Sequence, residues 1–245
     1  MLVEICLPLK NEAETLKLNF QKLYSFCEET GFSFDWKIIG IINGSSDETV
    51  DIFLDFKKRY PQYIDFVEII ADGRGHALNK YWQLSRADIL CYLDIDLAVK
   101  PDQLPALIQP LLDNAADLVI GSRLLSTSRI ERSFIRETTS RCFNIFARYL
   151  LPNKASDLQC GFKAIKADVF RKIAPYLKNN YWFFDSELVI MVQYFSYRLQ
   201  EIPVDWVENR YKKRKSKVKI ISDIYKSIGD LIIFRIRLFF ISKTK

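Results

Sequence analysis

Histidine is nearly absent from this sequence, since His76 is the only one among 245 residues. A metal site built from several histidines is therefore excluded. A Ser-His-Asp triad would have to use His76, and no nucleophile elbow accompanies it. The five cysteines are odd in number, widely spaced and without a C-x-x-C pair. We therefore expect neither a disulfide framework nor a zinc–thiolate site, and we expect most of the cysteines to be reduced residues of the core.

Long hydrophobic runs are missing as well. No uncharged run reaches the ~18 residues that a membrane-spanning helix needs. Residues 1–5 have neither a basic region nor a long apolar stretch, which is typical of a first strand and not of a signal peptide. Gly and Pro number eight each and form no low-complexity linker. We expect no signal peptide, no transmembrane span and a cytoplasmic location.

The net charge of +6 is distributed unevenly along the chain. Residues 209–245 hold twelve Lys or Arg and two Asp, a local charge of +10, whereas residues 1–208 carry a local charge of −4. A mildly acidic body with a strongly basic tail indicates an anionic surface as partner, either nucleic acid or anionic lipid. A solvated run of charges is the alternative.

Short runs rich in Ile and Val alternate with helical patterns through the first half of the chain. This alternation predicts an α/β fold with a Rossmann-like, mostly parallel sheet and helices on both faces. After Arg123 strand and helix patterns no longer alternate strictly. This favours a second half of the chain that adds to the same sheet. The expected strands are 2–9, 36–42, 64–70, 89–93, 118–120 and 162–165, with an extended stretch at 199–206. The expected helices are 12–27, 47–60, 75–85, 101–112, 135–150, 184–197 and 220–241.

Ligands of such sheets bind at the carboxyl ends of the strands. Four segments occupy such ends: 8–12, 43–47, 94–96 and 121–123. The most informative is Asp94-Ile95-Asp96, which follows an apolar strand. Two carboxylates separated by one residue point the same way and suit a hard divalent cation that also holds phosphate oxygens. A solvated acidic loop is the alternative.

Three segments together resemble family 2 glycosyltransferases of the GT-A fold. They are Pro8-Leu9-Lys10-Asn11-Glu12, Asn43-Gly44-Ser45-Ser46-Asp47 and Asp94-Ile95-Asp96. The resemblance implies that the first two, with Pro8, Glu12 and Asn43, hold the base and ribose of a nucleoside-diphosphate sugar. It also implies that Asp94 and Asp96 bind Mg²⁺ or Mn²⁺ on the diphosphate.

The second half narrows the resemblance to polyprenyl- and dolichyl-phosphate glycosyltransferases, closest to the dolichyl-phosphate β-glucosyltransferases. The motifs are Asp157-Leu158-Gln159-Cys160-Gly161-Phe162-Lys163, Trp182-Phe183-Phe184-Asp185-Ser186-Glu187, Val204-Asp205-Trp206-Val207-Glu208 and Ser216-Lys217. Gly121-Ser122-Arg123 and the spacing of Arg136, Ser140, Arg141 and Asn144 also fit. The implied reaction transfers a sugar, with glucose from UDP-glucose as first choice, to a polyprenyl phosphate at the cytoplasmic face of a membrane.

Three segments depart from the pattern of the family. Asn43 stands where the family has an acid, so it can hydrogen-bond a base or ribose but supplies no charge. Leu97 and Ala98 follow the two aspartates, which leaves the other metal ligands to the diphosphate and water. Arg74 takes the place of the basic residue of a G-K-G segment, and we expect it near the diphosphate or the base.

Charge indicates the acceptor side. A helix that begins near residue 134 places Arg136, Ser140 and Asn144 on one stripe, which with Arg123 suits the phosphate of an acceptor. An ordinary amphipathic helix is the alternative. Asp185 and Glu187 follow the aromatic run 181–184. Carboxylates beside aromatic rings suit the binding of a sugar. The alternative is that Asp185 caps the start of a helix. The remaining residues expected to bind substrate are Asp157, Gln159, Lys163, Trp182, Asp185, Glu187, Ser216 and Lys217.

The expected reaction is a single displacement with inversion, in which an oxygen of the acceptor phosphate attacks the anomeric carbon. Phosphate monoesters have a second pKa near ~6, so this oxygen is anionic at pH 7 without a general base. Arg123 and Arg136 would orient it. An acceptor hydroxyl would instead need a base, for which Asp185 comes first and Asp157 second.

Three other functions compete with this expectation. One is a glycosyltransferase with a saccharide or another soluble acceptor. Another is a sugar-nucleotide pyrophosphorylase, which would need a Gly-rich basic loop near the N-terminus. The third is a non-catalytic membrane- or nucleic-acid-binding protein that keeps the fold.

Residues 212–219 form a dense basic run, and apolar residues recur at helical spacing through 220–241. This composition predicts a C-terminal amphipathic helix on an anionic membrane surface, a helix packed on the domain, or both. We expect a GT-A domain over 1–210, with a donor and metal half at 1–123 and an acceptor half at 124–210, and a membrane-associating tail at 211–245. Lipid and not nucleic acid is the expected partner, and a homo-oligomer stays open.

Overall fold

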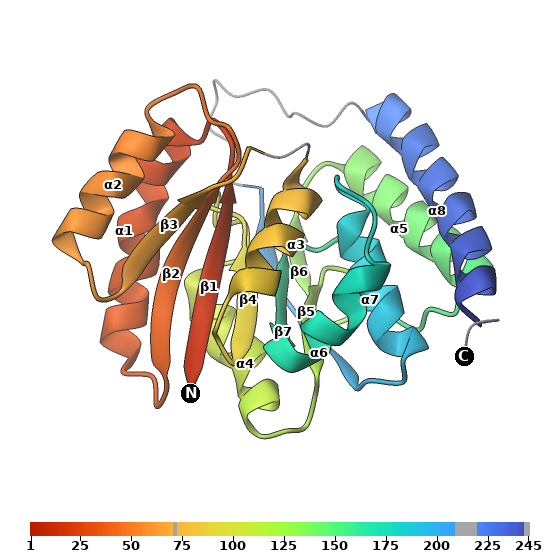
Figure 1. The fold of residues 1–245 in the computed structure, drawn as a ribbon. Helices are drawn as coiled ribbons and strands as arrows, with labels where there is room; N and C mark the ends of the chain where they lie inside the picture. The colour runs from red at the N-terminus through yellow and green to blue at the C-terminus, as the bar shows by residue number, and fades with distance from the viewer. Residues whose placement is uncertain (71–72, 209–219, 243–245) are drawn as a thin grey trace.

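The computed structural model describes residues 1–70, 73–208 and 220–242. Its central sheet has seven strands in the order β3-β2-β1-β4-β7-β5-β8, and β6 pairs with β9 in a separate sheet (Figure 1). The strands are β1 (Leu2–Leu9), β2 (Asp35–Ile42), β3 (Ile64–Glu68), β4 (Ile89–Leu93), β5 (Leu118–Ser122), β6 (Arg129–Glu131), β7 (Phe162–Lys166), β8 (Leu199–Pro203) and β9 (Asp205–Val207). The α-helices are α1 (Ala13–Thr30), α2 (Thr49–Arg59), α3 (Arg74–Leu84), α4 (Leu104–Leu112), α5 (Phe134–Leu150), α6 (Ala167–Ile173), α7 (Phe184–Tyr194) and α8 (Ile220–Ser242).

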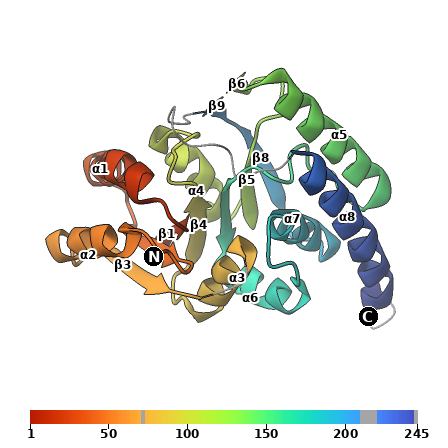
Figure 2. The same cartoon turned by 90° about the horizontal axis from the view of Figure 1, so that it is seen from above.

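The predicted α/β fold with helices on both faces of a mostly parallel sheet is confirmed (Figure 2). The strands predicted at 2–9 and 89–93 have these bounds in the structure, while other elements shift by a few residues at their ends. Two short elements, β6 and α6, were not expected. β7 is antiparallel to its neighbours β4 and β5, which the apolar pattern could not predict.

Every residue of β4 is buried, because helices cover both sides of the strand. Ile89, Cys91 and Leu93 point to one face and pack with α1, α2 and α4, whereas Leu90 and Tyr92 point to the other. This alternation follows from the period of two in a strand. Four of the five cysteines are buried and all are unpaired; Cys142 is the exposed one.

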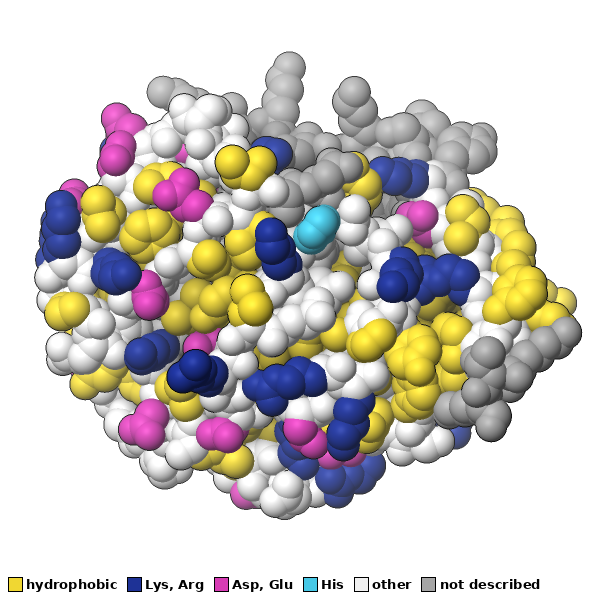
Figure 3. All heavy atoms as spheres, in the orientation of Figure 1, with side chains coloured by type: hydrophobic (Ala, Val, Ile, Leu, Met, Phe, Trp, Pro, Cys, Tyr) yellow, Lys and Arg dark blue, Asp and Glu magenta, His cyan; other side chains and the backbone are white. Residues whose placement is uncertain are grey.

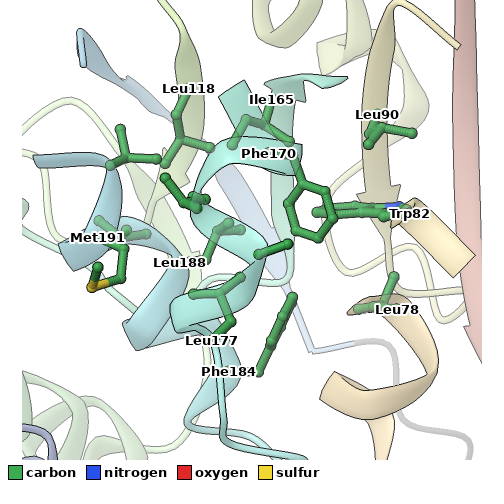
Figure 4. Close-up of a cluster of buried hydrophobic side chains, with 14 of the residues drawn as sticks. Leu78, Trp82, Leu90, Leu118, Ile165, Phe170, Leu177, Phe184, Leu188 and Met191 are labelled. Carbon is green, nitrogen blue, oxygen red and sulfur yellow. The ribbon is translucent and has the colours of Figure 1, made fainter. Parts of the chain in front are cut away.

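The core on the second face is formed largely by α3, α6 and α7 (Figure 4). Trp82 of α3 is fully buried and packs edge to face on Phe170 of α6, with ring centroids 5.0 Å apart. Its indole N–H donates to the sulfur of Cys6 on β1 at 3.3 Å. These contacts anchor α3, whose first turn reaches the carboxyl edge of the sheet.

The C-terminal helix α8 lies beside α5 on the side of the molecule next to α7 (Figures 1 and 2). Leu231, Phe234 and Leu238 form its buried inner face, so the helix packs on the domain. Its outer face carries exposed Ile and Phe side chains. Within the described ranges, none of the helices combines the length and the apolar character needed to cross a membrane.

Candidate active site

The carboxyl ends of β1, β2 and β4 meet at one edge of the sheet, the upper edge in Figure 1. β1 pairs with β2 on one side and with β4 on the other, and ligands of α/β sheets bind where the chain diverges in this way. β7 is antiparallel and therefore begins at this edge, where Phe162 pairs with Leu93. The turn before β7 thereby brings Gly161 against Asp94.

Asp94 and Asp96 are half-buried and line a small pocket together with Gly161 and Trp206. A Cβ on residue 161 would lie 2.2 Å from Oδ2 of Asp94. Any residue other than glycine would therefore displace this carboxylate. Two carboxylates at one pocket fit a hard cation such as Mg²⁺ or Mn²⁺. In the described part of the chain no third His, Cys, Asp or Glu completes a metal cluster. Nucleotide and water oxygens would have to supply the other ligands.

Arg74, in the first turn of α3, reaches into this pocket. Its Nη2 lies 2.9 Å from Oδ1 of Asp94, and its Nη1 lies 3.7 Å from Oδ2 of Asp185. The guanidinium lies over the rings of Tyr92 and Trp182, at 5.0 and 5.2 Å from their centroids. Burial by itself would lower the pKa of Arg74, but the carboxylates of Asp94 and Asp185 outweigh it and raise the pKa. Arg74 is therefore a fixed cation between two acids.

Two glycines let the start of α3 approach the segment before α7. Gly73 has a φ of +106°, and a Cβ there would lie 2.1 Å from the backbone oxygen of Asn180. A Cβ on Gly75 would lie 2.4 Å from Cβ of Phe184. This close packing is what places Trp182 over the guanidinium of Arg74.

The predicted nucleotide side lies at the ends of β1 and β2. Pro8 is half-buried in β1, Glu12 directly precedes α1, and Asn43 is buried just after β2. Nδ2 of Asn43 donates to the backbone oxygen of Gly73 at 3.1 Å. An ionised aspartate has no hydrogen to donate to a carbonyl. The amide at position 43 therefore has a structural role, because it ties the end of β2 to Gly73, the residue that directly precedes Arg74 and α3.

Lys163 and Asp185 form a buried pair behind Arg74. Nζ of Lys163 lies 3.3 Å from Oδ1 of Asp185 and donates to the backbone oxygen of Cys160, while Tyr92 donates its hydroxyl hydrogen to the same carboxylate oxygen. Burial raises the pKa of Asp185 to about 7 and lowers the pKa of Lys163 to about 7. Both oxygens of Asp185 thus face hydrogen-bond donors. Asp185 could act as a base only if these contacts broke.

Arg123 follows β5 and forms a two-pronged ion pair with the fully buried Asp157. Nε lies 2.6 Å from Oδ2 and Nη2 lies 2.9 Å from Oδ1. Burial by itself would raise the pKa of Asp157, but Arg123 holds it at about 2. Asp157 also accepts the backbone N–H of Gln159, whose side chain is half-buried. The Arg123 guanidinium lies over the ring of Trp206, 4.9 Å from the centroid, and Trp206 lines the pocket of Asp94 and Asp96.

The polar stripe predicted on α5 faces the domain. Ser140 and Asn144 are buried, and Nδ2 of Asn144 donates to the backbone oxygen of Ser140 at 2.9 Å. Arg136 is half-buried and forms an ion pair with Glu208, the residue just after β9. The Ser140 hydroxyl has no hydrogen-bond partner among the residues that the structure describes.

Arg132, which our sequence analysis did not single out, lies between β6 and α5. Its Nε and Nη2 atoms are buried and make no hydrogen bond to the described residues. Burial lowers the pKa of Arg132, and the nearby Arg123 lowers it further. A half-buried guanidinium beside a second one, with two nitrogens that bond to none of the described residues, forms a site that an anion would complete. No motif marks this position; its only signal is a basic residue just before a helix.

One predicted substrate-binding position that the structure describes, Glu187, lies outside this cluster. Glu187 is buried and is bound by Arg237 of α8 and by two backbone N–H groups, so its carboxylate serves the junction with α8. The motif Ser216-Lys217 lies outside the described residues. Arg136 and Ser140 lie on α5. Most of the other predicted positions, from Pro8 and Asn43 to Trp182 and Asp185, lie around the edge formed by β1, β2, β4 and β7 or beside Trp206.

The sheet order, the helices on both faces and the paired aspartates after β4 define a GT-A fold. Residues 4–174 match the profile of Glycosyl transferase family 2. The chain belongs to this family.

Similar proteins include the Glycosyltransferase AglD of Haloferax volcanii, 30% identical over 226 residues, 91% of this chain and 35% of that protein. Dolichyl-phosphate beta-glucosyltransferase of Saccharomyces cerevisiae is 28% identical over 251 residues, 95% of this chain and 74% of that protein. This chain thus spans about a third of the first relative. A crystal structure of glucosyl-3-phosphoglycerate synthase from Mycobacterium tuberculosis, in complex with Mn²⁺, UDP and glucosyl-3-phosphoglycerate, has a TM-score of 0.65 at 16% identity, covering 96% of this chain and 79% of that one. This structural similarity, at 16% identity, shows the fold alone.

Proposed function

We propose that this chain is an inverting, metal-dependent glucosyltransferase that moves glucose from UDP-glucose to a polyprenyl or dolichyl phosphate at the cytoplasmic face of a membrane. The observation that carries the proposal is the arrangement of charge around Trp206. Asp94 and Asp96 line a pocket with Trp206, and Arg123 lies over its ring. Such a site has an acidic part for a metal with a diphosphate and a basic part for a second phosphate. The name of the yeast relative supports glucose and the lipid phosphate.

On the donor side, Asp94 and Asp96 would hold Mg²⁺ or Mn²⁺. A cation there supplies charge neutralisation for the departing nucleoside diphosphate. In the structure Arg74 contacts Asp94, so the guanidinium and a metal compete for the same carboxylate. Arg74 released from Asp94 remains beside the pocket, where its planar donors suit the diphosphate oxygens.

On the acceptor side, Arg123, Arg132 and Arg136 would bind and orient the lipid phosphate. The attacking oxygen is already anionic at pH 7, because the second pKa of a phosphate monoester is about 6. The reaction then needs orientation and charge neutralisation more than it needs a base. This agrees with Asp185, whose two oxygens are occupied by Lys163, Tyr92 and Arg74.

The function is tested by mass spectrometry of the products. The protein is incubated with Mn²⁺, a short polyprenyl phosphate in vesicles, and a panel of UDP- and GDP-sugars. We expect a hexosyl phospholipid from UDP-glucose and at least about a hundredfold less from Asp94→Asn, because the metal site is lost. Product on a free saccharide or on 3-phosphoglycerate but not on lipid would assign a soluble acceptor. A folded protein without product from any pair would contradict the proposal.

Replacement of Arg132 tests the acceptor side. We expect Arg132→Met to raise the KM for the polyprenyl phosphate about tenfold, because one charge-assisted contact to phosphate is lost. The KM for the donor should stay unchanged, as measured by initial rates with each substrate varied. Arg129→Met is the matched control, since Arg129 is a nearby exposed cation. An unchanged acceptor KM in Arg132→Met would remove this residue from the site.

We propose that α5 and α8 form the surface that lies on the membrane. Hydrophobic side chains gather on the side of the molecule where α8 lies (Figure 3). Exposed apolar patches on soluble proteins mark docking surfaces, and a basic segment beside one favours anionic lipid. The basic run 212–219 that precedes α8 lies outside the described residues. The exposed apolar residues are Phe134, Ile135, Ile145, Phe146 and Tyr149 on α5, and Ile232, Ile233, Ile236, Phe239 and Phe240 on α8.

This surface is tested by flotation with phosphatidylserine vesicles. We expect the double variant Phe239→Ser/Phe240→Ser to lower the partition coefficient about tenfold or more, because two large apolar side chains no longer enter the lipid. The control is Leu18→Ser/Leu54→Ser, which replaces exposed leucines of α1 and α2. An equal loss in both variants, or none in the first, would contradict this surface.

A further inference from the structure

Glu187 is a buried carboxylate whose partners come from two distant parts of the chain. Its Oε2 accepts the backbone N–H groups of Lys178 and Asn179 at 2.7 and 2.8 Å. Its Oε1 lies 2.5 Å from Nη1 of Arg237, and Arg237 also donates to the backbone oxygen of Tyr176. This ion pair therefore fastens α8 to α7, and the backbone contacts of Glu187 and Arg237 tie both helices to the segment before α7.

The helix α8 contacts the same segment, 176–187, at two further points. Phe234 packs edge to face on Phe183, with ring centroids 5.9 Å apart. The ammonium of Lys226 lies over the ring of Tyr181, 3.9 Å from its centroid. Contacts spread over three turns of α8 thus hold this segment in place.

The same segment also forms a wall of the active site. The backbone oxygen of Asn180 accepts an N–H from the first turn of α3 at 3.1 Å. Trp182 lies over the guanidinium of Arg74, and Asp185 faces it. The segment therefore determines where Arg74 stands, and Arg74 contacts Asp94.

We propose that Arg237 is a positioning residue for the donor site. Its ion pair with Glu187 fixes the segment 178–184, and this segment keeps the Arg74 guanidinium beside the pocket of Asp94, within reach of the donor diphosphate. The helix whose outer face we assign to lipid is on this account also a structural part of the nucleotide and metal site. The inference rests on the proposed function, because it takes the pocket of Asp94 as the place where the donor binds.

The variants are chosen so that loss of the ion pair can be told from loss of the fold. Arg237→Met/Glu187→Gln removes the pair without leaving a buried unpaired charge. Arg237→Lys keeps the charge, but one ammonium cannot reproduce the planar fork that serves Glu187 and the Tyr176 carbonyl. Arg235→Met is the matched control, because Arg235 is an exposed cation two residues away on the same helix.

Two measurements are made on the full chain: UDP affinity in the presence of Mn²⁺ by calorimetry, and hydrogen exchange by mass spectrometry. We expect the double variant to bind UDP about tenfold more weakly, in line with the effect of losing residues that support a metal site. Amide exchange should become faster in 176–187 and 73–77 and stay unchanged in the central strands. Arg237→Lys should fall between the double variant and the wild type, and Arg235→Met should equal the wild type.

Wild-type UDP affinity in the double variant, despite faster exchange in 176–187, would overturn the proposal. Faster exchange throughout the sheet would also overturn it, because the pair would then support only global stability. A wild-type protein that binds no UDP with Mn²⁺ would instead reject the proposed function. In that case amide exchange at 73–77 tests the positioning role of Arg237. Faster exchange there in the double variant would support this role, and unchanged exchange would reject it.

Discussion

The guanidinium of Arg74 stands between carboxylates that the fold brings to one edge of its sheet. Asp94 and Asp185 both face it, and Asp96 lines the same pocket as Asp94. Carboxylates this close cannot all stay ionised unless a cation accompanies them. Much of the surrounding structure serves to hold that cation. Two glycines at 73 and 75 admit the neighbouring segment, and the rings of Tyr92 and Trp182 confine the guanidinium.

On the proposed acceptor side, arginines are again paired with carboxylates, but positive charge exceeds negative charge. Arg123 is balanced by Asp157, and Arg136 by Glu208, whereas two guanidinium nitrogens of Arg132 make no hydrogen bond to the described residues. An acidic pocket and the guanidinium of Arg123, which has Arg132 nearby, therefore both contact Trp206. A reaction between a metal-bound diphosphate sugar and an anionic phosphate needs both. Helix α5, which carries Arg136, contacts α8, and several exposed apolar side chains on both helices would let a lipid phosphate arrive from a membrane surface.

Much of this arrangement was predictable, because burial leaves a periodic signal in the sequence. The strand 89–93 is apolar throughout since helices cover both its faces, and the carboxyl-end rule then located Asp94 and Asp96. Contacts between distant segments leave no such signal. The antiparallel direction of β7, which brings Gly161 to Asp94, is one example. Another is Glu187, which looks like part of a sugar-binding motif and is bound by Arg237, fifty residues further along the chain.

The competition between Arg74 and a metal for Asp94 is the claim that the account depends on most, and Mn²⁺ affinity measured without nucleotide tests it most directly. Titration followed by electron paramagnetic resonance would compare the wild type with Arg74→Met. The account predicts that the variant binds Mn²⁺ about tenfold more tightly, because removal of a cation in contact with a carboxylate frees its charge for another. Unchanged or weaker Mn²⁺ binding in the variant would contradict it.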